Sequence, residues 1–120
     1  MDRVGRRTWD LQTATERTGD VLILTASGRI GSEAAPILAR ALDATRQESP
    51  RVIVDLDAVD YISGSGLTVL HDASQAAASA GGKMILCRLR EPVRIAFELA
   101  GLLDDVAIAA TRAGALEKMT

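Results

Sequence analysis

The chain has 120 residues, of which 48% are hydrophobic and 25% charged, a composition typical of one globular domain. Its formal net charge is −2 at pH 7, and its aromatic residues are one Trp, one Tyr and one Phe. Nucleic-acid binding is therefore not expected, because phosphate contacts need clustered cations and single strands need aromatic side chains for stacking.

The sequence also indicates a cellular compartment. No stretch approaches the roughly 20 apolar residues of a membrane-spanning helix, and no apolar run of a secretory signal follows the N-terminal arginines. The single cysteine, Cys87, lies among apolar residues, which indicates a buried structural thiol in a reducing compartment. We therefore expect a cytoplasmic protein without membrane insertion, with a flexible N-terminus over residues 1–7 and one domain over residues 8–120.

The first third of the chain predicts a hairpin and a helix. Residues 8–15 alternate loosely, and a Gly-Asp turn separates them from the apolar run 21–26, so the two segments should pair. Gly28 and Gly31 are expected to break the chain after this run, and Ser32 is well placed to cap the next helix. Apolar residues then recur at helical spacing until shortly before the next proline.

The rest of the chain alternates strands with helices. Residues 51–56 are a β-branched run suited to a strand buried on both faces, and the DAVDYISGSG segment leads from it to a helix over about 65–80. That helix has its apolar face at Leu67, Leu70, Ala73 and Ala77. The remaining predicted elements are a strand over 83–89, a helix from about Pro92 that buries Val93, Ala96, Phe97 and Ala100, a weak strand over 106–109 and a short helix from Thr111.

Strands that alternate with helices predict an α/β fold. We expect a mixed, mostly parallel central sheet of four to five strands that begins with an N-terminal hairpin. About four helices should flank this sheet.

The most informative feature is a serine between two glycines at the start of the second helix. At such a helix start, free backbone N–H groups and the helix dipole favour negative charge, so the Ser65 hydroxyl is suited to accept a phosphoryl group. From spacing alone the simpler interpretation is that Ser65 or Ser63 caps the helix. A phosphate-cradling loop is not favoured, because Val69 stands where a third glycine is needed and no P-loop lysine follows.

The segment VIVDLDAVDYISGSGLTVL, residues 52–70, resembles the signature of the STAS family of anti-sigma factor antagonists. The family pattern is a hydrophobic strand, Asp-Leu-Ser, a short loop, and Asp-Ser-Ser/Thr-Gly-Leu at a helix start. The Asp-Leu pair at 55–56 and the Ser-Gly-Leu triplet at 65–67 match this pattern. Departures are Asp57 for the usual Ser, Ser63 for the usual Asp, and Gly64 for the usual Ser.

The resemblance implies a protein-binding switch. The unphosphorylated protein would bind an anti-sigma factor, a serine kinase of the GHKL-ATPase type, and so free a sigma factor. Phosphorylation of Ser65 would end this binding, and a PP2C-type phosphatase would reverse it; Ser63 is the weaker alternative acceptor. In this scheme the chain needs no cofactor or metal and acts as a monomer or weak dimer. The alternative is a STAS scaffold, or a small subunit of a transporter or stress-signalling complex, without phospho-switching.

An enzyme is not expected. His71 is the only histidine, and no third group that would orient it toward Ser65 can be identified. The adjacent acids Asp104 and Asp105 lack further ligands for a metal.

A partner that senses Ser65 has to cover its surroundings. We expect the polar side chains of the second helix, which include His71 and Gln75, to face solvent there, and the loop after the second strand to lie nearby. The predicted partner footprint comprises Ser63, Gly64, Ser65, Gly66, Thr68, Asp72, Gly31 and Ser32.

Overall fold

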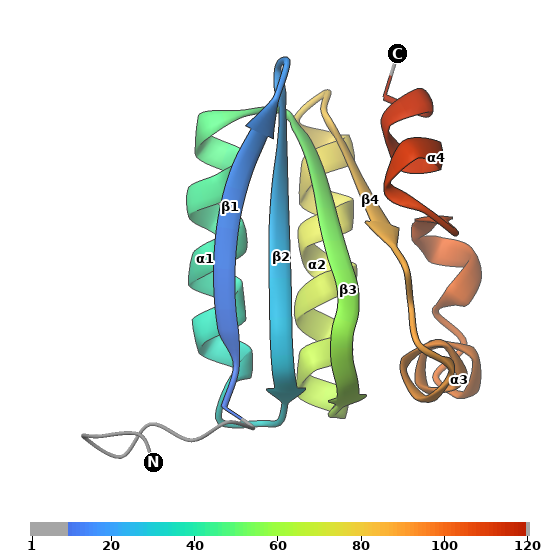
Figure 1. Cartoon of the computed structure of the whole chain (residues 1–120). Helices are drawn as coiled ribbons and strands as arrows, with labels where there is room; N and C mark the ends of the chain where they lie inside the picture. Colours follow the sequence, from blue (N-terminus) through green and yellow to red (C-terminus); the bar gives the residue numbers. More distant parts are fainter. Residues whose placement is uncertain (1–9, 120) are drawn as a thin grey trace.

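A five-stranded sheet forms the centre of the computed structural model, which describes residues 10–119 (Figure 1). The strands lie side by side in chain order, and the first pair is antiparallel while all later pairs are parallel. This confirms the predicted mixed, mostly parallel sheet with an N-terminal hairpin. The predicted flexible segment 1–7 and the first two residues of the predicted first strand lie outside the described residues. The strands are β1 (Gln12–Thr18), β2 (Val21–Ile30), β3 (Arg51–Ile62), β4 (Lys83–Cys87) and β5 (Ala107–Ala109).

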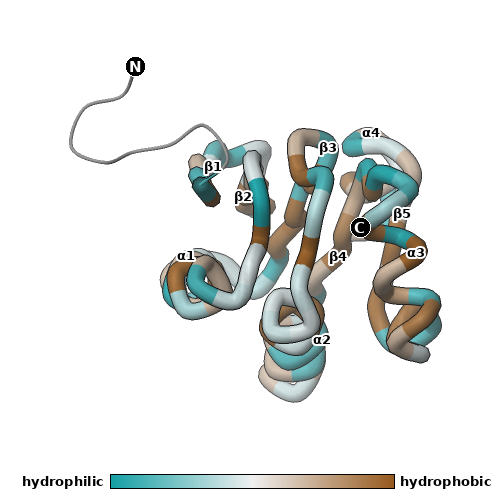
Figure 2. Tube along the Cα trace, turned by 90° about the horizontal axis from the view of Figure 1, so that it is seen from below, coloured by the Kyte–Doolittle hydropathy of each residue, from teal (hydrophilic) through white to brown (hydrophobic). Residues whose placement is uncertain are grey.

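Helices cover both faces of the sheet, but unequally. Three of them lie on one face, and the short C-terminal helix lies on the other, over β3 to β5 (Figure 2). None of the helices described over residues 10–119 is long and apolar enough to cross a membrane. The helices are α1 (Ala35–Glu48), α2 (Gly64–Ser79), α3 (Glu91–Leu99) and α4 (Arg112–Glu117), with a 3₁₀ turn, η1 (Leu103–Asp105), before β5.

The core is aliphatic and lies mainly between the sheet and the larger helical layer. Alternate residues of β3, such as Val52, Val54 and Leu56, are fully buried there, as strand geometry requires. The predicted apolar face of α2 is confirmed, because all four of its residues are buried in this core. A smaller cluster on the opposite face joins strand residues to α4, and comprises Val21, Ile23, Ile53, Ile85, Cys87, Ala109, Ala115 and Met119.

Several predicted details of the chain are wrong. Gly28 does not break the second strand but lies within β2, where its φ of 102° accommodates a local irregularity in the pairing. Ser32 does not cap α1; Ala34 occupies the N-cap position without a side-chain hydrogen bond, and a proline in the first turn sets the helix start. In α3 the predicted burial of Ala100 is also wrong, because this residue is exposed at the helix end.

The largest difference concerns β3, which continues six residues beyond the predicted end, to Ile62. It remains paired with β2 because it accommodates two extra residues: Thr25 pairs with Asp55 but Ser27 with Ala58, and the register shifts again before Arg29. The extra length carries β3 to the end of the sheet at which β2 also finishes, where Ile62 pairs with Ile30. There it places the start of α2 directly beside the end of β2.

Candidate functional site

Ser63 holds the start of α2 in place. Its hydroxyl oxygen accepts a hydrogen bond from the backbone N–H of Gly66 at 3.1 Å, which is the usual capping interaction. Its own backbone N–H donates to the carbonyl oxygen of Ile30 at 2.8 Å, so the residue also joins α2 to the end of β2. With 8% of its surface exposed, Ser63 is a structural residue, and the cap proposed from the sequence belongs to it.

Ser65 lies one residue inside the same helix and is exposed. Its hydroxyl makes no hydrogen bond to any residue that the structure describes, so it is not needed to form the helix. The first-turn N–H groups and the positive end of the helix dipole lie beside it. An exposed hydroxyl at such a position can receive a phosphate, whose negative charge the helix start would stabilise.

Gly66 lets α2 approach the sheet closely. A Cβ atom at this position would lie 2.6 Å from Cγ2 of Ile30 and 2.8 Å from Cγ1 of Ile62, both of them buried side chains. Gly64, two residues earlier, has nothing within 4 Å of the equivalent point. The two glycines on either side of Ser65 therefore have different roles, one in packing and one in keeping the surface around the hydroxyl open.

This difference predicts opposite effects of the same substitution. Gly66→Ala should lower the free energy of unfolding by about 1–2 kcal/mol, because overpacking outweighs the helix propensity gained. Gly64→Ala, the matched control, should leave stability unchanged or raise it by up to about 1 kcal/mol. Urea unfolding followed by circular dichroism measures both. Equal shifts for the two variants would show that contact with Ile30 does not exclude a side chain at position 66.

The other residues of the predicted footprint surround Ser65 on the same edge of the molecule. The hydrogen bond between Ser63 and Ile30 brings the loop that carries Gly31 and Ser32 next to the start of α2. Ser32 is exposed and Gly31 is half-buried. Along α2, Thr68 is exposed and donates its hydroxyl hydrogen to the carbonyl oxygen of Gly64 at 3.1 Å, and Asp72 is exposed one turn further on.

Gln75 is exposed as predicted, whereas His71 is half-buried against η1 rather than open to solvent. The Nε2 atom of His71 lies 3.6 Å from a carboxylate oxygen of Asp105, and its Nδ1 atom lies 3.6 Å from Asp72. Gln75 donates a hydrogen bond to the backbone oxygen of Asp105. These contacts hold the turn before β5 against α2, and no hydrogen bond joins His71 to Ser65 among the described residues.

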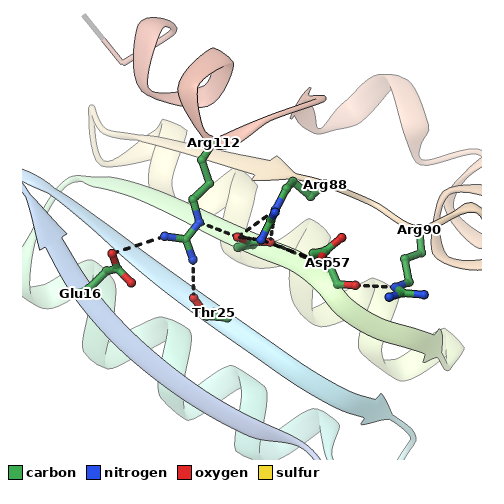
Figure 3. Close-up of polar contacts among 7 residues, drawn as sticks. Glu16, Thr25, Asp57, Arg88, Arg90 and Arg112 are labelled. Carbon is green, nitrogen blue, oxygen red and sulfur yellow. Dashed lines mark hydrogen bonds and ion pairs between the residues drawn. The ribbon is translucent and has the colours of Figure 1, made fainter.

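A charged cluster around one buried carboxylate, on the opposite face of the sheet, was not predicted (Figure 3). The carboxylate of Asp55, in the middle of β3, is fully buried. Arg88, just beyond β4, shares its single Nε–H between the two carboxylate oxygens and donates a further hydrogen bond from Nη2, at 3.0–3.2 Å. Arg112, at the start of α4, donates one from Nε at 2.6 Å. Arg112 also donates to the hydroxyl of Thr25 and pairs with Glu16, so the cluster connects β1, β2, β3, β4 and α4.

These contacts decide the charge state of Asp55. Burial by itself raises the pKa of the carboxyl, but hydrogen bonds from Arg88, Arg112 and the backbone N–H of Asp57 lower it by more, so its pKa lies below the ordinary value. Asp55 is therefore ionised at neutral pH. Arg88 reaches it from a left-handed backbone conformation, φ 58°, which a non-glycine residue adopts only where surrounding contacts compensate.

The sequence contained a signal for this cluster. An acidic residue in an otherwise apolar strand has to be paired, because an isolated buried charge is too costly. The partners could not be identified, since Arg88 and Arg112 lie 33 and 57 residues further along the chain. The neighbouring Cys87 is buried as predicted, and burial, together with the charge on Asp55, raises the pKa of its thiol to about 11.

Comparison with known families identifies this arrangement. A family model described as "STAS domain" matches residues 12–115, which include every strand, α1 to α3 and the serine-containing segment 63–66. The chain belongs to the STAS domain family.

Relatives of this STAS domain carry related names. BtrV of Bordetella bronchiseptica, named as a candidate anti-sigma factor antagonist, is 30% identical over 106 residues, which are 88% of this chain and 91% of BtrV. An anti-sigma factor antagonist of Mycobacterium paratuberculosis has the same fold with a TM-score of 0.79 at 25% identity, over 92% of this chain and 94% of that one. A Thermotoga maritima structure with a similar name aligns with a TM-score of 0.82 at 22% identity, over 89% of this chain and 93% of that one.

Proposed function

We propose that this STAS domain is an anti-sigma factor antagonist whose partner binding is switched off by phosphorylation of Ser65. The observation that carries the proposal is the division of roles at the start of α2. Ser63 is buried and caps the helix, so the exposed hydroxyl of Ser65 is left available for modification. The near full-length similarity to BtrV, named for this function, supports the same assignment.

The partners proposed here are those that the family resemblance implies. The unphosphorylated domain, residues 8–120, binds an anti-sigma factor that is a serine kinase of the GHKL type and thereby frees a sigma factor. A PP2C-type phosphatase removes the phosphate and restores binding. The domain acts in the cytoplasm as a monomer or weak dimer, and it is a ligand and substrate rather than an enzyme. The proposed footprint of the partner is the set of eight residues given above, which includes Ser65.

The energetics of this switch favour release of the partner without unfolding of the domain. A phosphoserine adds about −1.5 to −2 charges at neutral pH. At the start of α2 this charge stabilises the isolated domain by roughly 0.3–1 kcal/mol through the helix dipole. In a closed interface, however, an unpaired buried charge costs several kcal/mol. The interface term is larger, so the phosphorylated domain stays folded and dissociates.

Phosphate mapping tests the assignment of the acceptor. After incubation with the purified anti-sigma factor kinase and ATP, we expect mass spectrometry of proteolytic peptides to find one phosphate, on Ser65. Ser65→Ala should abolish incorporation. Ser63→Ala, the matched control, should still be phosphorylated, because loss of a cap typically costs only about 1 kcal/mol of stability. A phosphate on Ser63 alone, or none at all, would contradict the proposal.

A further inference from the structure

A groove of about 220 Å³ runs between α1 and α2, on the surface that faces away from the sheet. The two helices lie side by side under the sheet (Figure 2). Each contributes one stripe at positions i, i+3, i+4 and i+7, so the groove is straight and about two turns long. The stripes are Ala39, Leu42, Asp43 and Arg46 from α1, and Val69, Asp72, Ala73 and Ala76 from α2.

The groove has an apolar floor and an acidic rim. Its floor is made of Leu42 and Ala73, both buried, and small side chains above them leave the space open. On the rim, Arg46 donates to Asp43 through Nη2 at 2.6 Å, so these two charges compensate each other. Asp72 pairs with no Lys or Arg of the described residues, and the side chain of Asp72 is 72% exposed. The Nδ1 atom of His71 lies 3.6 Å from the Asp72 carboxylate. The rim therefore carries net negative charge.

The groove is also continuous with the proposed phosphorylation site. Ser65, Val69, Asp72 and Ala76 follow one another at i, i+4, i+7 and i+11, so they form a single stripe along α2. With a rise of 1.5 Å per residue, Ser65 lies only about 10 Å from Asp72 along the helix axis. A partner that lies in the groove thus ends beside the Ser65 hydroxyl.

We propose that this groove binds one helix of the anti-sigma factor kinase, with an apolar side chain on the floor and a Lys or Arg beside Asp72. The proposal rests on the function proposed above and adds the element and the charge of the partner. A helix fits better than a strand, because the two walls are helices whose backbone groups are already bonded and offer no hydrogen bonds to an extended chain. The side-chain ridges of a third helix can pack into the groove. The acidic rim selects a cationic flank on that helix.

Binding measurements without ATP test the groove apart from phosphorylation. Titration calorimetry with the purified kinase should show that Asp72→Lys and Ala76→Met each lower affinity at least tenfold, one by charge repulsion and the other by filling the groove. Ala78→Met, on an exposed side of α2, and Glu98→Lys, on the exposed side of α3, are matched controls that should bind within twofold of the parent. Asp72 is exposed, so Asp72→Lys folds even if Ala76→Met proves destabilised in thermal unfolding.

A cross-link identifies the occupant. A benzophenone side chain introduced at position 68, which is exposed one turn before Asp72 and does not line the groove, should cross-link to a kinase helix that carries Lys or Arg. A cross-link to a strand or loop, or parent-like affinity of both groove variants while the kinase still phosphorylates Ser65, would overturn the groove proposal and leave the switch intact. A kinase that neither binds the parent nor phosphorylates Ser65 would instead refute the proposed function, and the groove proposal with it.

Discussion

Replacement of Asp55 by alanine is expected to lower the free energy of unfolding by about 3 kcal/mol at pH 7. Removing one partner of a buried ion pair typically costs about 3–5 kcal/mol, because the remaining charge is left without compensation. Here the loss lies at the lower end, since Arg88 and Arg112 are 42% and 31% exposed and can regain water. Chemical denaturation at equilibrium measures the change.

A neighbouring acid provides the control. Asp57 is exposed, and its carboxylate lies 3.8 Å from Arg88, a separation at which exposed ion pairs contribute little. Asp57→Ala should therefore change stability by no more than about 0.5 kcal/mol. A loss of no more than about 0.5 kcal/mol for Asp55→Ala as well would show that the charged cluster around Asp55 is not an important source of stability.

The same cluster predicts how stability depends on pH. The pKa of Asp55 is lowered in the folded state, so as the pH falls the unfolded state takes up this proton first. The stabilisation by Asp55 is therefore complete at neutral pH and is lost as the pH falls below about 4, toward the folded-state pKa. The unfolding free energy of Asp55→Asn, which cannot titrate at this position, should fall less between pH 7 and pH 3 than that of the parent.

Sequence patterns predicted those parts of the fold that depend on local periodicity. The apolar face of α2 and the order of strands and helices follow from the spacing of aliphatic residues, which burial determines directly. The end of β3 was missed because Asp57, Asp60 and Tyr61 interrupt the apolar pattern. All three are exposed. Tyr61 pairs with Arg29 of β2, while Asp57 and Asp60 fall at the two register shifts, so pairing of their neighbours with β2, rather than burial, maintains the β conformation.

Prediction of the site depended on the same distinction between local and distant contacts. That a serine near position 65 caps α2 could be inferred, but the choice of Ser63 rests on the approach of β2, whose Ile30 fixes its backbone N–H. The assignment of Ser32 as a cap failed because the turn before α1 is closed by backbone hydrogen bonds to the carbonyl oxygen of Gly31 instead. The groove between α1 and α2 requires the spacing of two helices, which neither helix specifies alone.

Substitution of Ser65 should separate binding from folding. We expect Ser65→Ala to bind the anti-sigma factor within about threefold of the parent, because Ser63 alone provides the cap. Ser65→Asp places a negative charge in the interface, and an unpaired buried charge costs several kcal/mol. Since each 1.4 kcal/mol corresponds to about a tenfold change in affinity, binding should fall by about a hundredfold or more. Titration calorimetry measures both variants.

Stability measurements make this result specific to the interface. The new carboxylate of the Ser65→Asp variant would lie in the first turn of α2, where an acidic side chain is favourable by about 0.3–1 kcal/mol. The melting temperature of this variant should therefore be equal to or above that of the parent. Ser65→Asn, similar in size but uncharged, distinguishes charge from bulk and should retain most of the affinity. If Ser65→Asp and Ser65→Ala both bind like the parent, a charge at this position does not control the partner. The domain would then act as a constitutive scaffold or transporter subunit. The helix start would tolerate a phosphate on Ser65, and this phosphate would weaken no interface.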